Sequence, residues 1–91
     1  MEITYDPAKN ARNLQDRGLS FECVAEFDFA TAKVSADTRK PYPEARYLAL
    51  GYLDDRLHVL CFTETATGLR VISFRKAKRE ARHHGFTLTR H

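Results

Sequence analysis

The sequence has no apolar run long enough to cross a bilayer and no apolar core near its first residue. A membrane helix needs about 20 consecutive apolar residues, and no stretch of these 91 residues approaches that length. The opening segment, residues 1–6, also lacks the apolar core of a secretory signal. These absences exclude a spanning helix, and we expect a cytoplasmic protein with no membrane partner.

Metal-ligating and nucleophilic motifs are absent as well. The two cysteines, Cys23 and Cys61, stand inside apolar runs without the close spacing of a zinc or redox motif, so we expect buried free thiols. The four histidines show no spacing typical of a metal site. There is no glycine-rich phosphate loop and no Gly-x-Ser-x-Gly elbow. We therefore expect no metal and no cofactor, and nucleotide-dependent or acyl-transfer chemistry is poorly supported.

The composition is that of an ordinary globular protein with an excess of basic residues. Apolar residues make up 43% of the chain and charged residues 30%, with a formal net charge of +3. A chain this short builds one hydrophobic core, and it contains no internal repeat or linker, so we expect a single domain over residues 1–91 with residues 85–91 as a loose tail. Because such a core is modest, a stabilising partner subunit is plausible.

The first part of the chain predicts a short strand followed by two helices. Ile3–Tyr5 favours a strand, and Asp6 followed by a proline is typical of a helix start. Gly18 is typical of a helix end, and Ser20 suits the cap of a second helix. The first helix carries Ala8, Ala11, Asn13 and Leu14. In the second helix an apolar stripe at helical spacing is expected to lie on the core, and its residues are Phe21, Val24, Ala25 and Phe29.

The remainder predicts an α+β fold with an antiparallel meander sheet, two N-terminal helices and a C-terminal basic helix. A strand at Thr31–Ser35 precedes a proline-containing loop at 36–44. Short connections, including a hairpin at Asp54-Asp55, force the later strands to be antiparallel. Because the middle strand is apolar on both faces, the last helix or a partner has to cover one of them. The later elements are strands at Ala45–Leu53, Arg56–Thr63 and Leu69–Arg75 and a helix at Lys76–His84.

The strongest local signal is the basic segment from Arg75 to Arg82, which holds five cations and one acid. If the segment is helical, Arg75, Arg79 and Arg82 form one stripe that suits phosphate groups. A solvated helix face is the alternative interpretation. Arg70 on the preceding strand weakens that alternative, since a strand cation must either point to solvent or line a groove.

A second cluster occupies the loop between Asp37 and Arg46, where acidic, basic and aromatic side chains come close together. Glu44 and Arg46 are two residues apart on an incipient strand, so they face the same way and either form an ion pair or share a substrate. His83 and His84 follow the basic segment. They are candidates for proton transfer, with a helix-terminus role as the alternative.

Several segments together resemble the BrnT family of toxins, the partners of BrnA antitoxins in bacterial type II toxin-antitoxin pairs. Each segment alone is a weak signal, but their order and spacing across nearly the whole chain are specific. The segments are Tyr5-Asp6-Pro7-Ala8-Lys9-Asn10 with Asn13 and Gly18, Ser20-Phe21, Asp37 with Arg39, Tyr42-Pro43-Glu44-Ala45-Arg46, Gly51, and Arg70-Val71-Ile72-Ser73-Phe74-Arg75-Lys76-Ala77 with Glu80.

The resemblance implies a RelE-like fold and a metal-independent endoribonuclease that cleaves RNA and inhibits translation. It also implies neutralisation by a BrnA-like antitoxin, with operator DNA bound only through the antitoxin complex. A non-catalytic nucleic-acid-binding or regulatory module, or a subunit that only stabilises its partner, is the alternative. We expect Glu44, Arg70, Arg75 and His83 to be catalytic, with His84 as a second candidate for proton transfer, and Lys9, Arg39, Arg46, Lys76, Arg79 and Arg82 to bind RNA.

The chain also departs from the family pattern. Asp16-Arg17 stands where many relatives have Lys-His, and Thr65 stands where relatives often have an arginine. Phe74 replaces the alanine of a common Ser-Ala-Arg, and His83-His84-Gly85-Phe86 replaces an aromatic end. These changes bear on activity more than on fold.

Overall fold

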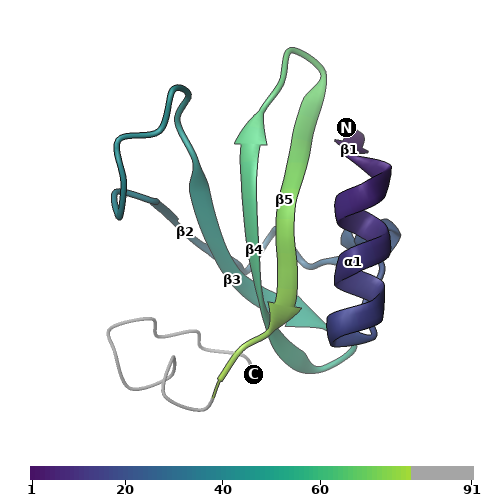
Figure 1. Cartoon of the computed structure of the whole chain (residues 1–91). Coiled ribbons are helices and arrows are strands. Elements are labelled where there is room, and N and C mark those ends of the chain that lie inside the picture. Colours follow the sequence, from purple (N-terminus) through teal and green to yellow (C-terminus); the bar gives the residue numbers. More distant parts are fainter. Residues whose placement is uncertain (79–91) are drawn as a thin grey trace.

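Residues 1–78 are described by a computed structural model, and they form a five-stranded sheet with helical segments along one edge and over one face (Figure 1). None of the helices in this part of the chain is long and apolar enough to span a membrane. In chain order the elements are β1 (Glu2–Tyr5), α1 (Pro7–Arg17), the 3-10 helix η1 (Phe21–Glu26), β2 (Lys33–Ala36), β3 (Tyr47–Leu53), β4 (Arg56–Glu64) and β5 (Gly68–Lys76).

The sheet is mixed, with strand order β1-β5-β4-β3-β2. The predicted antiparallel meander is confirmed for β3, β4 and β5, and β2 adds to it antiparallel to β3. The expectation of a wholly antiparallel sheet is wrong, because β1 pairs parallel to β5. This pairing joins the two ends of the described chain, with Glu2 opposite Gly68 and Tyr5 opposite Val71. Because the two strands are so far apart in sequence, no local sequence pattern indicates that they pair.

The first helix begins and ends where the sequence predicts. The Asp6 side chain accepts a hydrogen bond from the backbone N–H of Ala8, and Pro7 takes the first helical position. Gly18 ends the helix with a left-handed φ of 66°. The buried residue of α1 is the polar Asn13, whereas Leu14 is half-exposed, so this helix contacts the sheet through an amide side chain.

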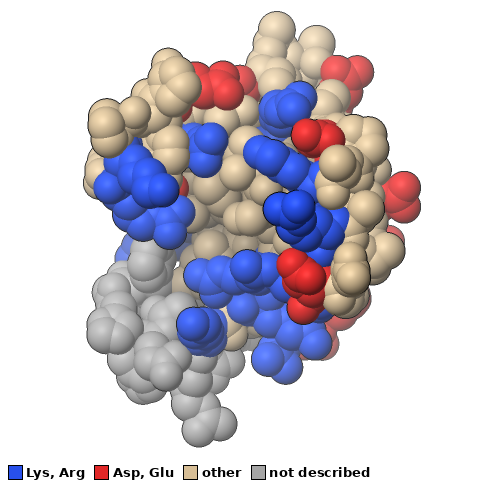
Figure 2. Space-filling model, viewed as in Figure 1, with Lys and Arg blue, Asp and Glu red and all other residues tan. Residues whose placement is uncertain are grey.

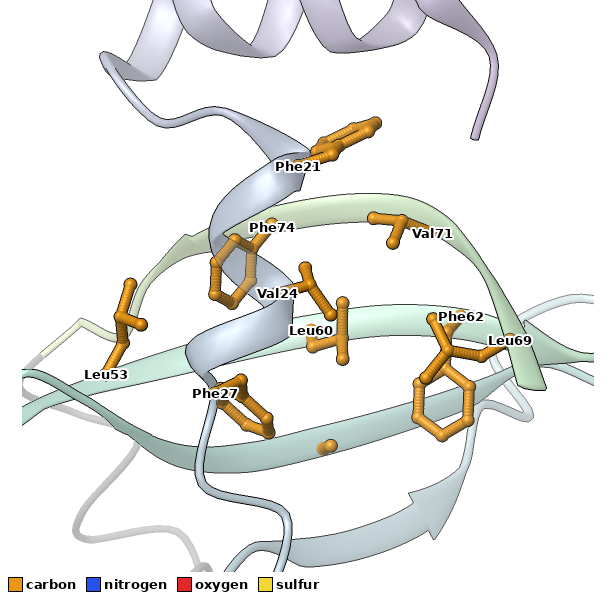
Figure 3. Close-up of a cluster of buried hydrophobic side chains, with 10 residues drawn as sticks. Phe21, Val24, Phe27, Leu53, Leu60, Phe62, Leu69, Val71 and Phe74 are labelled. Carbon is orange, nitrogen blue, oxygen red and sulfur yellow. The ribbon is translucent and has the colours of Figure 1, made fainter. Parts of the chain in front are cut away.

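The second helix is a 3-10 helix, capped by Ser20 as expected. A 3-10 helix has three residues per turn, so the residues that share its inner face are Phe21, Val24 and Phe27. The expectation from the 3.6-residue period that Ala25 packs inward is therefore wrong, and Ala25 is exposed. Figure 3 shows these side chains against the sheet. The rest of the buried cluster is Ala49, Leu53, Leu60, Phe62, Leu69, Val71 and Phe74.

The hairpin between β3 and β4 is confirmed at Asp54-Asp55. Both residues have positive φ, 48° and 65°, and Leu53 pairs with Arg56 across the turn. Positive φ at both central positions is the geometry of the two-residue turn whose twist matches that of the flanking strands.

The predicted closing helix does not begin at Lys76, because β5 continues through that residue. Lys76 pairs with His58, and the backbone N–H of Ala77 donates to the carbonyl of Leu57 over 2.9 Å. Lys76 and Ala77, which were predicted to lie in a helix, therefore pair with β4 or form hydrogen bonds to it instead. The remainder of that helix and the expected tail at 85–91 lie outside the described residues.

Candidate functional site

A β-bulge brings two arginines of β5 onto one face of the sheet. Arg70 and Arg75 are five residues apart, which in a regular strand would send their side chains to opposite faces. The register shifts between Cys61 and Phe62, which pair with Ser73 and Val71 and leave Ile72 as the extra residue. Since Phe74 and Val71 lie in the core under η1, both arginines project from the other face, which we call the cationic face.

Arg75 occupies the centre of this face, half-buried. Burial lowers the pKa of its guanidinium, and the nearby charges of Arg17 and Arg39 lower it further. A guanidinium stays charged in proteins. The lowered pKa of Arg75 therefore means that its charge is poorly solvated and is repelled by the neighbouring cations. A bound anion relieves both effects.

The loop before β3 is organised around the buried carboxylate of Asp37. Arg39 donates to it from Nε over 2.8 Å and from a terminal guanidinium nitrogen over 2.7 Å, and the Tyr42 hydroxyl donates over 3.2 Å. These bonds, with Arg39 first, hold the pKa of Asp37 well below its usual range, although burial opposes them. Asp37 is therefore an ionised anchor for the loop, and its sequence signals were its place in the charged and aromatic cluster at 37–46 and its match to the family pattern.

Arg46 and Glu44 line the same hollow, as their spacing predicts. This hollow has a volume of about 550 Å³ and is bounded by residues 36–42 and 44–46. The ion pair that was the alternative for these two residues is not formed among residues 1–78. Arg46 instead places its guanidinium carbon 4.2 Å from the centre of the Tyr42 ring, a cation–π contact, and Glu44 is exposed.

Figure 2 shows how these cations are distributed over one side of the molecule. Lysine and arginine side chains surround a central depression, along α1 on one margin and at the 36–46 loop on the other. Arg75 lies within electrostatic range of both margins, because the charges of Arg17 and Arg39 both lower its pKa. In the linings of the hollows on these two margins the cations outnumber the acids Asp16, Asp37 and Glu44, an arrangement that suits a polyanion.

The sequence reasoning missed Arg12 and Arg17. With Lys9, which it did propose, they line a second hollow between α1 and β5. Their spacing around Asn13 on one helix face was an available signal, but the helix was interpreted through its alanines and Leu14 instead.

Of the other proposed residues of the basic segment, the structure describes Lys76 alone. Alternation along β5 sends Lys76 to the opposite side from Arg75, and Lys76 is exposed. A helical stripe beginning at Arg75 is wrong, because that residue is in a strand. The remaining members, Arg79, Arg82, His83 and His84, lie outside the described residues.

The metal-ligating residue types are dispersed in the part of the chain that the structure describes, where no three of them lie together. Cys61 is buried and free, and burial raises the pKa of its thiol, while Cys23 is half-buried and free. His58 is buried against the ring of Phe74 with its Nδ1 2.8 Å from the Arg56 carbonyl, on the core side of the sheet. His58 therefore lies away from the cationic face, whereas the thiol of Cys61 lies beneath that face, where the charges of Asp37, Arg46 and Arg39 act on it.

Comparison with known proteins identifies the family and a similar structure. The profile of the family described as ribonuclease toxin, BrnT, of type II toxin-antitoxin system matches residues 5–81. The crystal structure of the Brucella abortus ribonuclease toxin BrnT is similar, with a TM-score of 0.68 and 26% sequence identity over 87% of this chain and 99% of that one. No curated protein sequence matches the chain significantly. The chain belongs to the BrnT family of ribonuclease toxins of type II toxin-antitoxin systems.

Proposed function

We propose that this chain is a metal-independent endoribonuclease that cleaves RNA on its cationic face and thereby inhibits translation. One observation carries the proposal: Arg75 is half-buried between the charges of Arg17 and Arg39. Holding like charges together destabilises the free protein, and a phosphodiester bound among them offsets that repulsion. Family membership supplies the reaction class, and Arg75 supplies the place on the molecule.

The reaction needs no group from outside the RNA and the protein. The 2′-hydroxyl loses its proton to a base and attacks the adjacent phosphorus. The P–O5′ bond breaks and the leaving 5′ oxygen takes up a proton, so the products carry a 2′,3′-cyclic phosphate and a 5′-hydroxyl. Negative charge increases on the phosphoryl oxygens in the transition state. A well-aimed donor at such a position contributes about 2.7–4 kcal/mol. We assign this role to Arg75 and Arg70, which the bulge places on one face.

Glu44 is the first candidate for the base that takes the 2′-hydroxyl proton. It is exposed and shares its hollow with Arg39 and Arg46, so its carboxylate is available to substrate beside cations. Asp37 is a poorer candidate because its oxygens already accept hydrogen bonds from Arg39 and Tyr42. His83 and His84 remain the second candidates for proton transfer, His83 first.

The fold and the partner protein are also part of the proposal. The proposed fold type is RelE-like, and the proposed inhibitor is a BrnA-like antitoxin that covers the toxin. Operator DNA would be bound only by the toxin-antitoxin complex. Support comes from membership in a family of type II toxins, since such a toxin acts with an antitoxin.

The direct test is incubation of the purified chain with an oligoribonucleotide in the presence of EDTA. We expect new 5′-hydroxyl ends, and we expect no cleavage where the attacking 2′-hydroxyl is replaced by hydrogen. An Arg75→Ala, Glu44→Ala double variant should lose toxicity on expression, whereas Arg56→Ala, which removes an exposed arginine at the hairpin, should keep it. A parent protein that makes no new RNA ends, with a double variant as toxic as the parent, would overturn the proposal. Intact RNA bound with a steep salt dependence would show a binding module instead.

A further inference from the structure

The hollow between α1 and β5 is cationic on its helix side and apolar on its strand side. It has a volume of about 160 Å³, enough for one base or sugar but not for a length of strand. Lys9, Arg12 and Arg17 contribute from one face of α1, and Ile72 contributes from β5. Ile72 is the extra residue of the bulge, half-buried beside α1. We call this feature the α1–β5 hollow.

Asn13 fixes the helix side of the α1–β5 hollow relative to the strand side. Its Nδ2 donates to the carbonyl oxygen of Phe74 on β5 over 2.9 Å and to that of Leu19 over 2.8 Å. Asn13 lies between Arg12 and Arg17 on the same helix face, so the two arginines are carried by a backbone that is pinned to β5. Side chains on a pinned helix are better placed for recognition than side chains on a loop.

The cations of the α1–β5 hollow are not neutralised by ion pairs. In residues 1–78 neither Lys9, Arg12 nor Arg17 lies within ion-pair distance of a carboxylate, and Asp16 is the one acid in the wall. All three cations are exposed to solvent and available to a ligand. Two or more phosphate groups of a single strand can therefore be contacted from this helix.

The α1–β5 hollow lies beside the proposed site of cleavage, because Ile72 in its wall and Arg75 are three residues apart on β5. The charge of Arg17 acts on Arg75, which projects from the cationic face of the same strand that contributes Ile72. Figure 2 shows lysine and arginine side chains following the margin of α1 down towards the centre of this face. Three residues of a strand span about 10 Å, so a strand of RNA bound at Arg75 passes close to the α1–β5 hollow.

From this geometry we infer that the α1–β5 hollow is a subsite for the nucleotide next to the cleaved bond, with its base or sugar against Ile72 and its phosphates on Arg12 and Arg17. The inference rests on the proposed ribonuclease function, which it deepens by naming how a longer RNA is held. Proteins hold single-stranded RNA by cations along its backbone and by surfaces against which its bases pack, most often aromatic ones. Ile72 offers an aliphatic surface of this kind.

The first test measures binding apart from cleavage, with a 2′-O-methyl oligonucleotide that cannot react. We expect an Arg12→Ala, Arg17→Ala variant to bind it more weakly, by roughly tenfold for each charge-assisted contact that is lost. The plot of log affinity against log salt should become shallower by about 1.4, since each phosphate contact to a single strand contributes about 0.7. The matched control, Arg56→Ala, should retain the parent affinity and slope. Equal affinity and slope in the double variant and the control would overturn the inference.

The second test asks whether Ile72 contacts a base. We expect Ile72→Ala to weaken binding of the ordinary oligonucleotide but not of one with an abasic sugar at the neighbouring position. Thermal unfolding of the variant checks that the sheet is intact. An equal loss with both oligonucleotides would show that Ile72 holds no base and would overturn this part of the inference.

The two proposals fail in different ways. A parent protein that binds the oligonucleotide with the expected slope but cleaves no RNA would overturn the ribonuclease function and leave the α1–β5 hollow as a binding site. A parent protein that cleaves RNA, with Arg12 and Arg17 variants of unchanged affinity, would overturn the subsite alone. Variants that lose antitoxin binding and keep RNA binding would identify a protein-docking site, which also overturns the subsite.

Discussion

The Nδ2 of Asn13 on α1 donates a hydrogen bond to the backbone carbonyl of Phe74 on β5, 2.9 Å away. β1 ends opposite Val71, so the part of β5 beyond that point has no neighbouring strand on that side. Asn13 supplies the donor that such a strand would have provided. The Asn13 side chain thus satisfies a backbone carbonyl at the open edge of β5. The same hydrogen bond sets the position of the cations on α1 relative to Arg75.

We predict that Asn13→Ala lowers the free energy of unfolding by about 1–3 kcal/mol, because it leaves the buried carbonyl of Phe74 without a partner. Urea denaturation measures the change. Gln15→Ala removes an exposed side chain from the same helix and serves as the control, with an expected change of under about 0.5 kcal/mol. Equal stability of the two variants would show that the hydrogen bond does not anchor α1.

We predict that Gly68→Ala destabilises the fold by about 1–3 kcal/mol through overpacking. A methyl group on Gly68 would collide with the backbone of Glu2, its partner in the parallel β1–β5 pair. Because backbone cannot move aside as a flexible side chain can, β1 should separate from the sheet. Amide hydrogen exchange of residues 2–5 measures this directly, and protection as in the parent protein would contradict the predicted register.

Stability should depend on pH through His58. Burial is the largest effect on this imidazole and lowers its pKa below the ordinary value of 6.5. The unfolded chain therefore binds the proton more readily, so stability should fall as pH decreases from about 7.5 to about 5.5, and His58 should have no effect at higher pH. The carboxylate of Asp37 stays ionised throughout this window, since its pKa is lowered.

The measurement is the urea midpoint of the parent protein and of His58→Gln at several pH values. The histidines at 83, 84 and 91 are common to both proteins, so the difference between the two curves isolates His58. We expect the variant to show a flatter pH dependence. Parallel curves would mean that His58 does not titrate differently on folding.

Asp37 should act as a positioning residue for Arg39. Asp37→Asn removes the charge that holds the guanidinium through two hydrogen bonds, at 2.7 and 2.8 Å, while adding net positive charge to the face. Because Arg39 is a proposed RNA-binding residue, we expect KM for RNA to rise by about tenfold, the scale of a charge-assisted hydrogen bond, while kcat changes little. The control is Glu64→Gln, an exposed acid at the end of β4. A lowered kcat with unchanged KM would contradict the binding role of Arg39 and place it in the chemical step instead.

Local chemistry made much of this fold predictable. The cap at Asp6, the end at Gly18 and the turn at Asp54-Asp55 each depend on neighbouring residues, and the structure has all three. The hollow of the 36–46 loop was likewise visible in sequence, because its acid, cations and aromatic ring are close together along the chain.

Features set by tertiary structure were not predictable. The bulge at Ile72 arises from the pairing of β5 with β4, and without it Arg70 and Arg75 would face opposite ways. The spacing of apolar residues at 21–29 did not distinguish a 3-10 helix from an α-helix. The basic composition after residue 75 did not show that β5 would extend through Lys76. The face of α1 that carries Arg12 and Arg17 is directed towards β5 by the hydrogen bond from Asn13 to Phe74, a long-range contact that the sequence does not show.

The measurement that tests the central claim most directly is the single-turnover rate of RNA cleavage by Arg75→Ala beside Arg56→Ala, at saturating protein and in EDTA. If Arg75 stabilises the phosphate during transfer, its removal should slow the chemical step by about 100- to 1,000-fold. Arg56→Ala should cleave at the parent rate. A rate for Arg75→Ala equal to that of Arg56→Ala would contradict the assignment of the cationic face as the site of cleavage.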